Sequence, residues 1–162
     1  MDVEERSKRV KLLLMDCDGV LTDGRLYFSE NGEELKTFHV RDGQGIVSWH
    51  RAGFKSGIIS GRNSKIVDVR AAELGIEFVR QGVSDKLTVC RELAHLTGVD
   101  LDEIAFVGDD SPDVEVMKAV GFAAAVADAV DEVKDAAHFK TKKKGGRGAV
   151  REIVDLLLAA ER

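Results

Sequence analysis

Leu12-Leu13-Leu14-Met15-Asp16-Cys17-Asp18-Gly19 decides the fold of this 162-residue chain, because a short apolar run ends there in two carboxylates one residue apart. An apolar run of this length predicts a buried strand, and open α/β sheets bind ligands at the carboxyl ends of their strands. Gly19 permits the backbone conformation that a tight turn and a closely approaching ligand require. The same residues also fit a strand followed by an acidic turn without function, so the rest of the sequence has to decide between the two interpretations.

The chain beyond this stretch alternates short apolar runs with longer segments of helical period, a pattern typical of a parallel sheet with helices on both faces. The expected strands are residues 11–15, 56–60, 77–79, 104–107 and 123–126. The expected helices are residues 45–52, 65–74, 85–96, 112–119, 131–136 and 149–160. The sequence therefore predicts a Rossmann-like α/β fold.

One piece interrupts this alternation directly after the acidic turn. Extended runs at 25–29 and 34–38 flank Glu30-Asn31-Gly32-Glu33, and Asn-Gly between extended runs favours a hairpin. No Pro- or Ser-rich linker and no internal repeat divides the sequence. We therefore expect a single domain over residues 1–162 with a small hairpin insertion at about 25–38 and a C-terminal tail at about 140–162.

Composition and charge restrict the class of protein. Hydrophobic residues make up 44% of the chain, which suits an ordinary globular core, and the formal net charge of −5 argues against a general affinity for nucleic acid. Cys17 and Cys90 are too few for a disulfide framework. The sequence has no signal-peptide core and no apolar run of membrane-spanning length. We expect a cytoplasmic protein with neither a membrane nor a nucleic acid as partner.

A second apolar run, at 104–107, also ends in glycine and carboxylates, Gly108-Asp109-Asp110-Ser111-Pro112-Asp113. Helix capping by Asp110 or Ser111 would account for one acidic residue at this turn, but not for three within five positions. If the two runs lie side by side in the sheet, their carboxylates meet at one edge, where mutual repulsion requires a cation. An all-oxygen site with room for water and a phosphate suits Mg²⁺.

Two further strand ends carry groups that bind anions. Ser60 supplies a hydroxyl, followed by backbone N–H groups at an expected helix start, and Lys86 lies in the expected first turn of the helix at 85–96. A lysine there opposes the helix dipole unless it faces an anion. Taken singly, Ser60 also fits a helix N-cap and Lys86 a solvated lysine. They indicate a functional site only because they follow the two acidic strand ends in the same chain.

In chain order these features resemble the four motifs of the haloacid dehalogenase-like superfamily: Asp-x-Asp-Gly at 16–19, an apolar run ending in Ser60, then Lys86, and Gly-Asp-Asp-x-x-Asp at 108–113. Longer strings at 16–24, 38–46, 60–62 and 145–152 resemble the family of 3-deoxy-D-manno-octulosonate 8-phosphate phosphatases. The resemblance extends over nearly the whole chain. Departures from the family pattern, at Cys17, His39 and Ser60, remove no required functional group.

The resemblance implies a Mg²⁺-dependent phosphatase of lipopolysaccharide biosynthesis that works through an aspartyl-phosphate. Asp16 would attack phosphorus, and Asp18 would protonate the leaving sugar oxygen and then deprotonate the hydrolytic water. Lys86 and Ser60 would bind the phosphoryl oxygens. The implied metal ligands are the carboxylates of Asp16 and Asp109 and the backbone carbonyl of Asp18, with Asp110 and Asp113 positioning metal-bound water or Lys86.

The resemblance also implies the substrate. In this subfamily arginine after the Ser60-Gly61 pair goes with the eight-carbon sugar acid, whereas relatives that act on nine-carbon sialic-type acid phosphates tend to carry glutamate there. A guanidinium fork matches a carboxylate, so Arg62 and Arg41 could both bind the acid group of the sugar. The implied substrate-binding residues are Gly61, Arg62, Arg41 and Arg147.

Many members of this superfamily carry a large cap domain after the first or second motif, and neither interval here is long enough for one beyond the hairpin, so the resemblance implies no cap domain. Capless relatives resemble one another in forming homotetramers in which the hairpins pair. The apolar hairpin residues would supply such an interface, although packing on their own domain fits them almost as well. These residues are Leu26, Tyr27, Phe28, Leu35 and Phe38.

The segment Lys144-Gly145-Gly146-Arg147-Gly148 precedes a strongly periodic helix, so it is tethered at both sides. Its glycines would let backbone N–H groups approach an anionic substrate, and Arg147 would add a positive charge. We expect this loop to close an active site. The resemblance places it on a neighbouring subunit, and closure within one subunit stays open.

Three classes of function stay open. The first is a phosphatase of the eight-carbon substrate or, alternatively, of a nine-carbon acid 9-phosphate. The second is a signalling receiver domain, which has its acidic pair near the first strand and its phosphorylated aspartate in mid-chain. Here the double aspartate comes late in the chain, and this order argues against a receiver domain. The third, a non-catalytic interaction module, is disfavoured because every catalytic group is present.

Overall fold

A six-stranded sheet forms the centre of the molecule, in a computed structural model that describes residues 1–161 apart from the side chain of Glu34. The strand order is β5-β4-β1-β6-β7-β8, and all neighbouring strands are parallel. The strands are β1 (Leu12–Met15), β4 (Lys55–Ile59), β5 (Phe78–Arg80), β6 (Ile104–Gly108), β7 (Phe122–Ala125) and β8 (Phe139–Lys140). The predicted parallel α/β sheet is confirmed, and the two-residue edge strand β8 is an addition to it.

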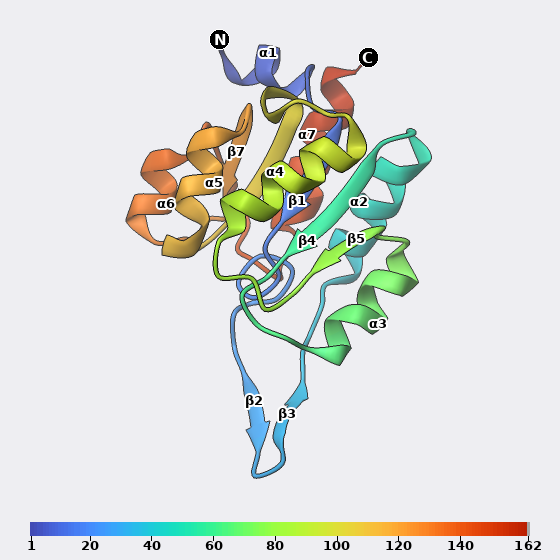
Figure 1. Ribbon diagram of the computed structural model, residues 1–162, viewed down its shortest axis with the longest axis vertical. Coiled ribbons are helices and arrows are strands. Elements are labelled where there is room, and N and C mark those ends of the chain that lie inside the picture. The colour runs from blue at the N-terminus through green and yellow to red at the C-terminus, as the bar shows by residue number, and fades with distance from the viewer. Residues whose placement is uncertain (162) are drawn as a thin grey trace.

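Helices cover both faces of the sheet, with α4 in front of it and α7 behind it in Figure 1. Short 3-10 turns at Leu101–Glu103 and Ser111–Asp113 flank β6. Within the described residues, no helix is long and apolar enough to cross a membrane. The helices are α1 (Val3–Ser7), α2 (Val40–Arg51), α3 (Lys65–Leu74), α4 (Lys86–Thr97), α5 (Val114–Ala119), α6 (Asp131–Ala136) and α7 (Ala149–Ala160).

Helix α2 begins at Val40 rather than at residue 45 as predicted. His39 caps it, because its ring Nδ1 accepts a hydrogen bond from the backbone N–H of Arg41 at 3.1 Å. Gly43 and Gly45 lie in the early turns and lower the helix propensity there. A Cβ at Gly45 would lie 3.3 Å from the Cα of Arg151 on α7, so this glycine allows the two helices to pack closely.

Strand β1 lies at the centre of the sheet, between β4 and β6. All four of its side chains are buried, because helices cover both faces, and this explains its uninterrupted apolar sequence. Met15 pairs with Ile58 on β4 and with Val107 on β6. The register therefore brings the segments that follow these three strands to the same edge of the sheet.

The hairpin of β2 (Tyr27–Ser29) and β3 (Gly32–Leu35) projects from this same edge (Figure 1). Its turn closes over Glu30-Asn31, and Gly32 begins β3 in the left-handed region at φ 108°. The strands are shorter than the predicted 25–29 and 34–38. Phe38 packs against the core beneath the Arg70 guanidinium, so for this residue the structure favours the alternative of packing on its own domain. The exposed apolar side chains of the hairpin region are Leu26, Tyr27, Phe28 and Leu35.

Candidate active site

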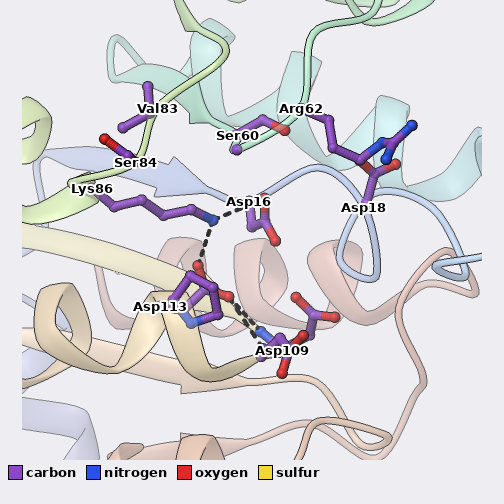
Figure 2. A pocket seen from close by; sticks show the side chains of 12 residues that line it. Asp16, Asp18, Ser60, Arg62, Val83, Ser84, Lys86, Asp109 and Asp113 are labelled. Atoms are coloured by element: carbon purple, nitrogen blue, oxygen red, sulfur yellow. Dashed lines mark hydrogen bonds and ion pairs between the residues drawn. The ribbon is translucent and has the colours of Figure 1, made fainter.

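A pocket of about 330 Å³ lies at the edge of the sheet where the strands end. Figure 2 shows side chains from the ends of β1, β4 and β6 and from the start of α4 around it. Every residue expected to act in catalysis or metal binding lines this pocket, whereas Arg41 and Arg147 do not. The lining residues are Asp16, Asp18, Ser60, Gly61, Arg62, Val83, Ser84, Lys86, Asp109, Asp110, Pro112 and Asp113.

Asp16 is the first residue after β1, and its carboxylate is almost completely buried. Its Oδ1 accepts a hydrogen bond from the backbone N–H of Cys17 at 2.8 Å and lies 3.1 Å from Lys86 Nζ. Burial and the charge of Asp113 raise the pKa of Asp16 to about 6, although Lys86 opposes the rise. The carboxylate is therefore oriented by two donors, the Cys17 N–H and Lys86.

Asp113 connects Lys86 to the turn that follows β6. Lys86 Nζ donates a hydrogen bond to Asp113 Oδ1 at 2.7 Å, while Asp113 Oδ2 accepts from the backbone N–H groups of Asp109 at 3.0 Å and Asp110 at 3.3 Å. Burial opposes the charge on Lys86, but the carboxylates of Asp16 and Asp113 outweigh it and raise the pKa of the lysine. Lys86 is thus a fixed cation that faces the Asp16 carboxylate, as the dashed lines in Figure 2 show.

The carboxylates of Asp16, Asp109 and Asp113 offer oxygen atoms within 4.8 Å of one another. Burial and the charge of Asp16 raise the pKa of Asp109 to about 9, and its Oδ1 is buried without a hydrogen-bond partner. A Cβ at Gly19 would lie 1.9 Å from Asp109 Oδ2, so only glycine leaves room for this carboxylate. Because Lys86 and two backbone N–H groups already occupy Asp113, Asp16 and Asp109 are the carboxylates that fit a hard divalent cation.

Ser60 follows β4 directly, and its backbone N–H donates to the carbonyl oxygen of Arg80 at 2.8 Å. Helix α3 begins at Lys65, as predicted, so the backbone N–H groups directly after Ser60 belong to a loop and not to the helix start expected there. The intervening loop carries Arg62, whose Nε lies 3.9 Å from Asp18 Oδ2. Ser60 and Arg62 both line the pocket, so this loop forms the wall opposite the acidic turn after β6 (Figure 2).

Comparison with known proteins identifies the family. The family model described as haloacid dehalogenase-like hydrolase matches residues 36–153. The chain belongs to the haloacid dehalogenase-like hydrolases. The hydrolase is 45% identical over 160 residues to 3-deoxy-D-manno-octulosonate 8-phosphate phosphatase KdsC of Yersinia pestis, an alignment that covers 99% of this chain and 86% of the relative.

Solved structures agree with this assignment. The crystal structure of the Yersinia pestis phosphatase has a TM-score of 0.96 to this hydrolase at 45% identity, covering 99% of this chain and 86% of that one. The phosphatase of Moraxella catarrhalis, solved in complex with magnesium ion, phosphate ion and a KDO molecule, has a TM-score of 0.95 at 39% identity. That match covers 98% of this chain and 91% of the other. The family resemblance read from the four motifs is confirmed.

The glycine-rich loop of the hydrolase before α7 packs on the segment that follows β1. The backbone N–H of Gly145 donates to Asp128 Oδ1 at 3.0 Å, and that of Gly146 donates to the carbonyl oxygen of Val20 at 2.9 Å. A Cβ at Gly145 would lie 1.7 Å from the carbonyl oxygen of Gly19. The expectation that these N–H groups meet a substrate was therefore wrong, because they bind oxygens of their own chain.

Arg147 and Arg41 are exposed outside the pocket. Arg147 Nη2 lies 4.0 Å from Asp23 Oδ2, and Arg41 lies in the first turn of α2. Their assignment to substrate binding, and the closure of a neighbouring subunit's site by the loop around Arg147, stay predictions.

Sequence analysis missed Lys36 and Glu33, which lie beside the pocket. Lys36 Nζ donates a hydrogen bond to Asp18 Oδ1 at 2.5 Å and lies 3.1 Å from Glu33 Oε2. Both residues belong to a hairpin segment rich in charged residues, where side chains are usually solvated. No local sequence pattern marks either of them as buried.

Proposed function

We propose that this hydrolase is a Mg²⁺-dependent phosphatase that converts 3-deoxy-D-manno-octulosonate 8-phosphate to the free sugar acid and phosphate, a step of lipopolysaccharide biosynthesis. The main support is the position of Asp16, 3.1 Å from Lys86 in the pocket that Asp18 and Ser60 also line. The name of the Yersinia pestis relative and the ligands of the Moraxella catarrhalis structure support the choice of substrate.

Asp16 is the proposed nucleophile. Its carboxylate attacks phosphorus in line, the bond from phosphorus to the sugar oxygen breaks, and an aspartyl-phosphate forms. The Lys86 ammonium and the Ser60 hydroxyl bind the phosphoryl oxygens, where charge develops in the transition state. The two donors that orient the Asp16 carboxylate, the Cys17 N–H and Lys86, hold it for this attack.

Asp18 is the proposed proton carrier. In the first step its carboxyl group donates a proton to the sugar oxygen as that oxygen leaves. In the second step the resulting carboxylate takes a proton from the water that attacks the aspartyl-phosphate. Phosphate then leaves, and both Asp16 and the protonated Asp18 are regenerated.

Mg²⁺ would be held by the carboxylates of Asp16 and Asp109 and by the backbone carbonyl of Asp18. When bound, it supplies positive charge that offsets the repulsion between a carboxylate nucleophile and a phosphate dianion. The neighbouring Asp110 would orient water near the ion, and Asp113 would position Lys86. The buried, unpartnered Oδ1 of Asp109 supports this assignment.

Gly61 and Arg62 are proposed to select the sugar acid, with Arg41 and Arg147 as further contacts. Arg62→Ala should lower the preference for the eight-carbon substrate over a nine-carbon acid 9-phosphate about 10- to 150-fold, the loss of one charge-assisted contact of about 1.5–3 kcal/mol. The ratio of kcat/KM values for the two substrates measures this. Arg51→Ala, at the exposed end of α2, is the control and should leave the ratio unchanged. A wild-type preference for the nine-carbon substrate would refute the assignment.

The chain is further proposed to be one cytoplasmic domain without a cap that assembles as a homotetramer through its hairpins. Leu26 and Leu35 are 44% and 46% exposed, and a partner subunit would cover them. We expect tetramer mass for the wild type in light scattering and a smaller mass for the double variant Leu26→Ser, Leu35→Ser. Val69→Ser, on an exposed position of α3, should stay tetrameric. A wild type of monomer mass would contradict the proposal.

A further inference from the structure

Lys36 is a buried cation that the mechanism above does not use. It follows β3 directly, and its side chain is only 1% exposed. A buried ammonium is costly unless it is paired, because its hydration is lost. Its Nζ is hydrogen-bonded to Asp18 Oδ1 at 2.5 Å and lies 3.1 Å from Glu33 Oε2. Lys36 therefore ties the base of the hairpin to the segment that follows β1.

Glu33, the second partner of this lysine, is itself fixed by the loop that follows β4. The hydroxyl of Ser64 donates a hydrogen bond to Glu33 Oε1 at 2.7 Å, and Arg62 Nη2 lies 3.6 Å from Glu33 Oε2. Ser64 is the N-cap residue of α3, but its hydroxyl makes no capping hydrogen bond and binds the Glu33 carboxylate instead. The charges in this cluster balance, since two cations face two carboxylates. It joins the hairpin to the segment that follows β1 and to the loop that follows β4.

The two oxygens of Asp18 have different surroundings. Oδ1 receives the hydrogen bond from Lys36, while Oδ2 lies on the side of Arg62, at 3.9 Å from its Nε. The terminal torsion of an aspartate is broad, so a free carboxylate would sample many orientations. A short bond to one oxygen removes this freedom and leaves the other oxygen available on the pocket side, where Asp18 and Arg62 lie together (Figure 2).

We propose that Lys36, held by Glu33, is a positioning residue that orients the Asp18 carboxyl group, so that its other oxygen gives a proton to the leaving sugar oxygen and then takes one from the hydrolytic water. This inference rests on the proposed function, which gives Asp18 its role as proton carrier. Proton transfer depends on geometry at the scale of one ångström, and a misplacement of that size costs on the order of 10²-fold in rate. The hairpin thereby contributes to catalysis without touching substrate.

The test replaces Lys36 with methionine, which keeps the length of the side chain and removes the charge. We expect kcat for 3-deoxy-D-manno-octulosonate 8-phosphate to fall about 10- to 100-fold while KM changes less than twofold. The rate of the burst of p-nitrophenolate from p-nitrophenyl phosphate, which reports the first step, should fall much less, because that leaving group needs no proton. A lysine that only stabilised the fold would lower the melting temperature without this dependence on the leaving group. Lys118→Met, an exposed lysine paired with Glu115 on α5, is the matched control and should leave both rates unchanged.

Glu33→Gln provides a second variant that keeps Lys36 and loosens only its anchor. We expect a smaller loss of kcat in the same direction, and no additional loss when it is combined with Lys36→Met, since both act through Asp18. An unchanged kcat in folded Lys36→Met, or in Glu33→Gln if the first variant does not fold, overturns the inference.

The outcome for the wild type separates this inference from the proposed function. If the wild type hydrolyses other alkyl phosphates but not the sugar-acid phosphate, the substrate assignment fails, and the same comparison on the accepted alkyl phosphate decides the role of Lys36. If the wild type hydrolyses no phosphate monoester, both proposals fail.

Discussion

Asp16→Asn should lower kcat for phosphate release by at least about 10³-fold while the chain keeps its fold. The amide has the shape of the carboxylate but is a far poorer nucleophile, so the aspartyl-phosphate cannot form. Its carbonyl oxygen can still accept the hydrogen bond from the Cys17 N–H, which the carboxylate accepts at 2.8 Å. Removing one negative charge also relieves repulsion with Asp109 and Asp113, so we expect no loss of stability from the substitution.

Release of inorganic phosphate from the sugar-acid phosphate measures this effect, with circular dichroism to verify the fold. Wild-type protein quenched in acid during turnover should carry phosphate on Asp16, and the variant should carry none. Asp135→Asn, on an exposed position of α6, is the matched control and should retain full activity. A kcat within tenfold of the wild type would exclude Asp16 as the nucleophile.

Chelation of divalent cations should stop turnover and reveal a dependence of stability on pH. Burial and the Asp16 charge raise the pKa of Asp109 to about 9, and burial and the Asp113 charge raise that of Asp16 to about 6, from ordinary values of 3.8. A carboxyl group whose pKa is raised by folding binds its proton more tightly in the folded state. The contribution of the protonated Asp16 and Asp109 to the free energy of unfolding is thus complete below about pH 4. It is lost as the pH rises through 6 and then 9. Mg²⁺ needs ionised ligands, so its stabilising effect should grow over the same range.

Thermal unfolding between pH 5 and pH 9, with Mg²⁺ or with a chelator, measures both effects. The melting temperature of the chelated protein should fall with rising pH relative to that of Asp109→Asn, which lacks the titrating group. The increase caused by Mg²⁺ should be larger at pH 9 than at pH 5 and should be nearly absent in Asp109→Asn. Hydrolysis that continues in excess chelator would contradict the proposed role of Asp109 as a metal ligand. So would an increase in melting temperature by Mg²⁺ that is the same at pH 5 and pH 9.

The sequence was sufficient for most of the fold because the strands that matter are buried on both faces. Such strands have uninterrupted apolar sequences, as β1 and β6 do, and the turns between them contain glycine and acidic residues. β8 could not be predicted, since two residues have no periodicity and it lies at the edge of the sheet. The start of α2 was missed because Gly43 and Gly45 lower the local helix propensity. Gly45 is needed instead for the close packing of α2 on α7.

The pocket could be predicted for a topological reason. Parallel strands end at one edge of the sheet, so the residues after β1, β4 and β6 lie near one another whatever their separation in the chain. The contacts of Lys36 with Asp18 and of Ser64 with Glu33 follow from the path of the hairpin, which no local pattern encodes. The same holds for the backbone N–H groups of Gly145 and Gly146, whose partners became evident only from the packed loop.

The central place of β1 has a consequence for synthesis of the protein. This strand leaves the ribosome early, but its two neighbours, β4 and β6, come much later in the chain, and parallel pairing across such long separations is slow to form. Until Ile104–Gly108 and the turn after it have been made, the strand that precedes Asp16 lacks one of its two neighbours, and Asp16 lacks the other two carboxylates of the cluster, Asp109 and Asp113. For most of its synthesis the nascent chain is therefore inactive and prone to pair with other unfinished chains. The active site forms only when the second half of the chain folds onto the first.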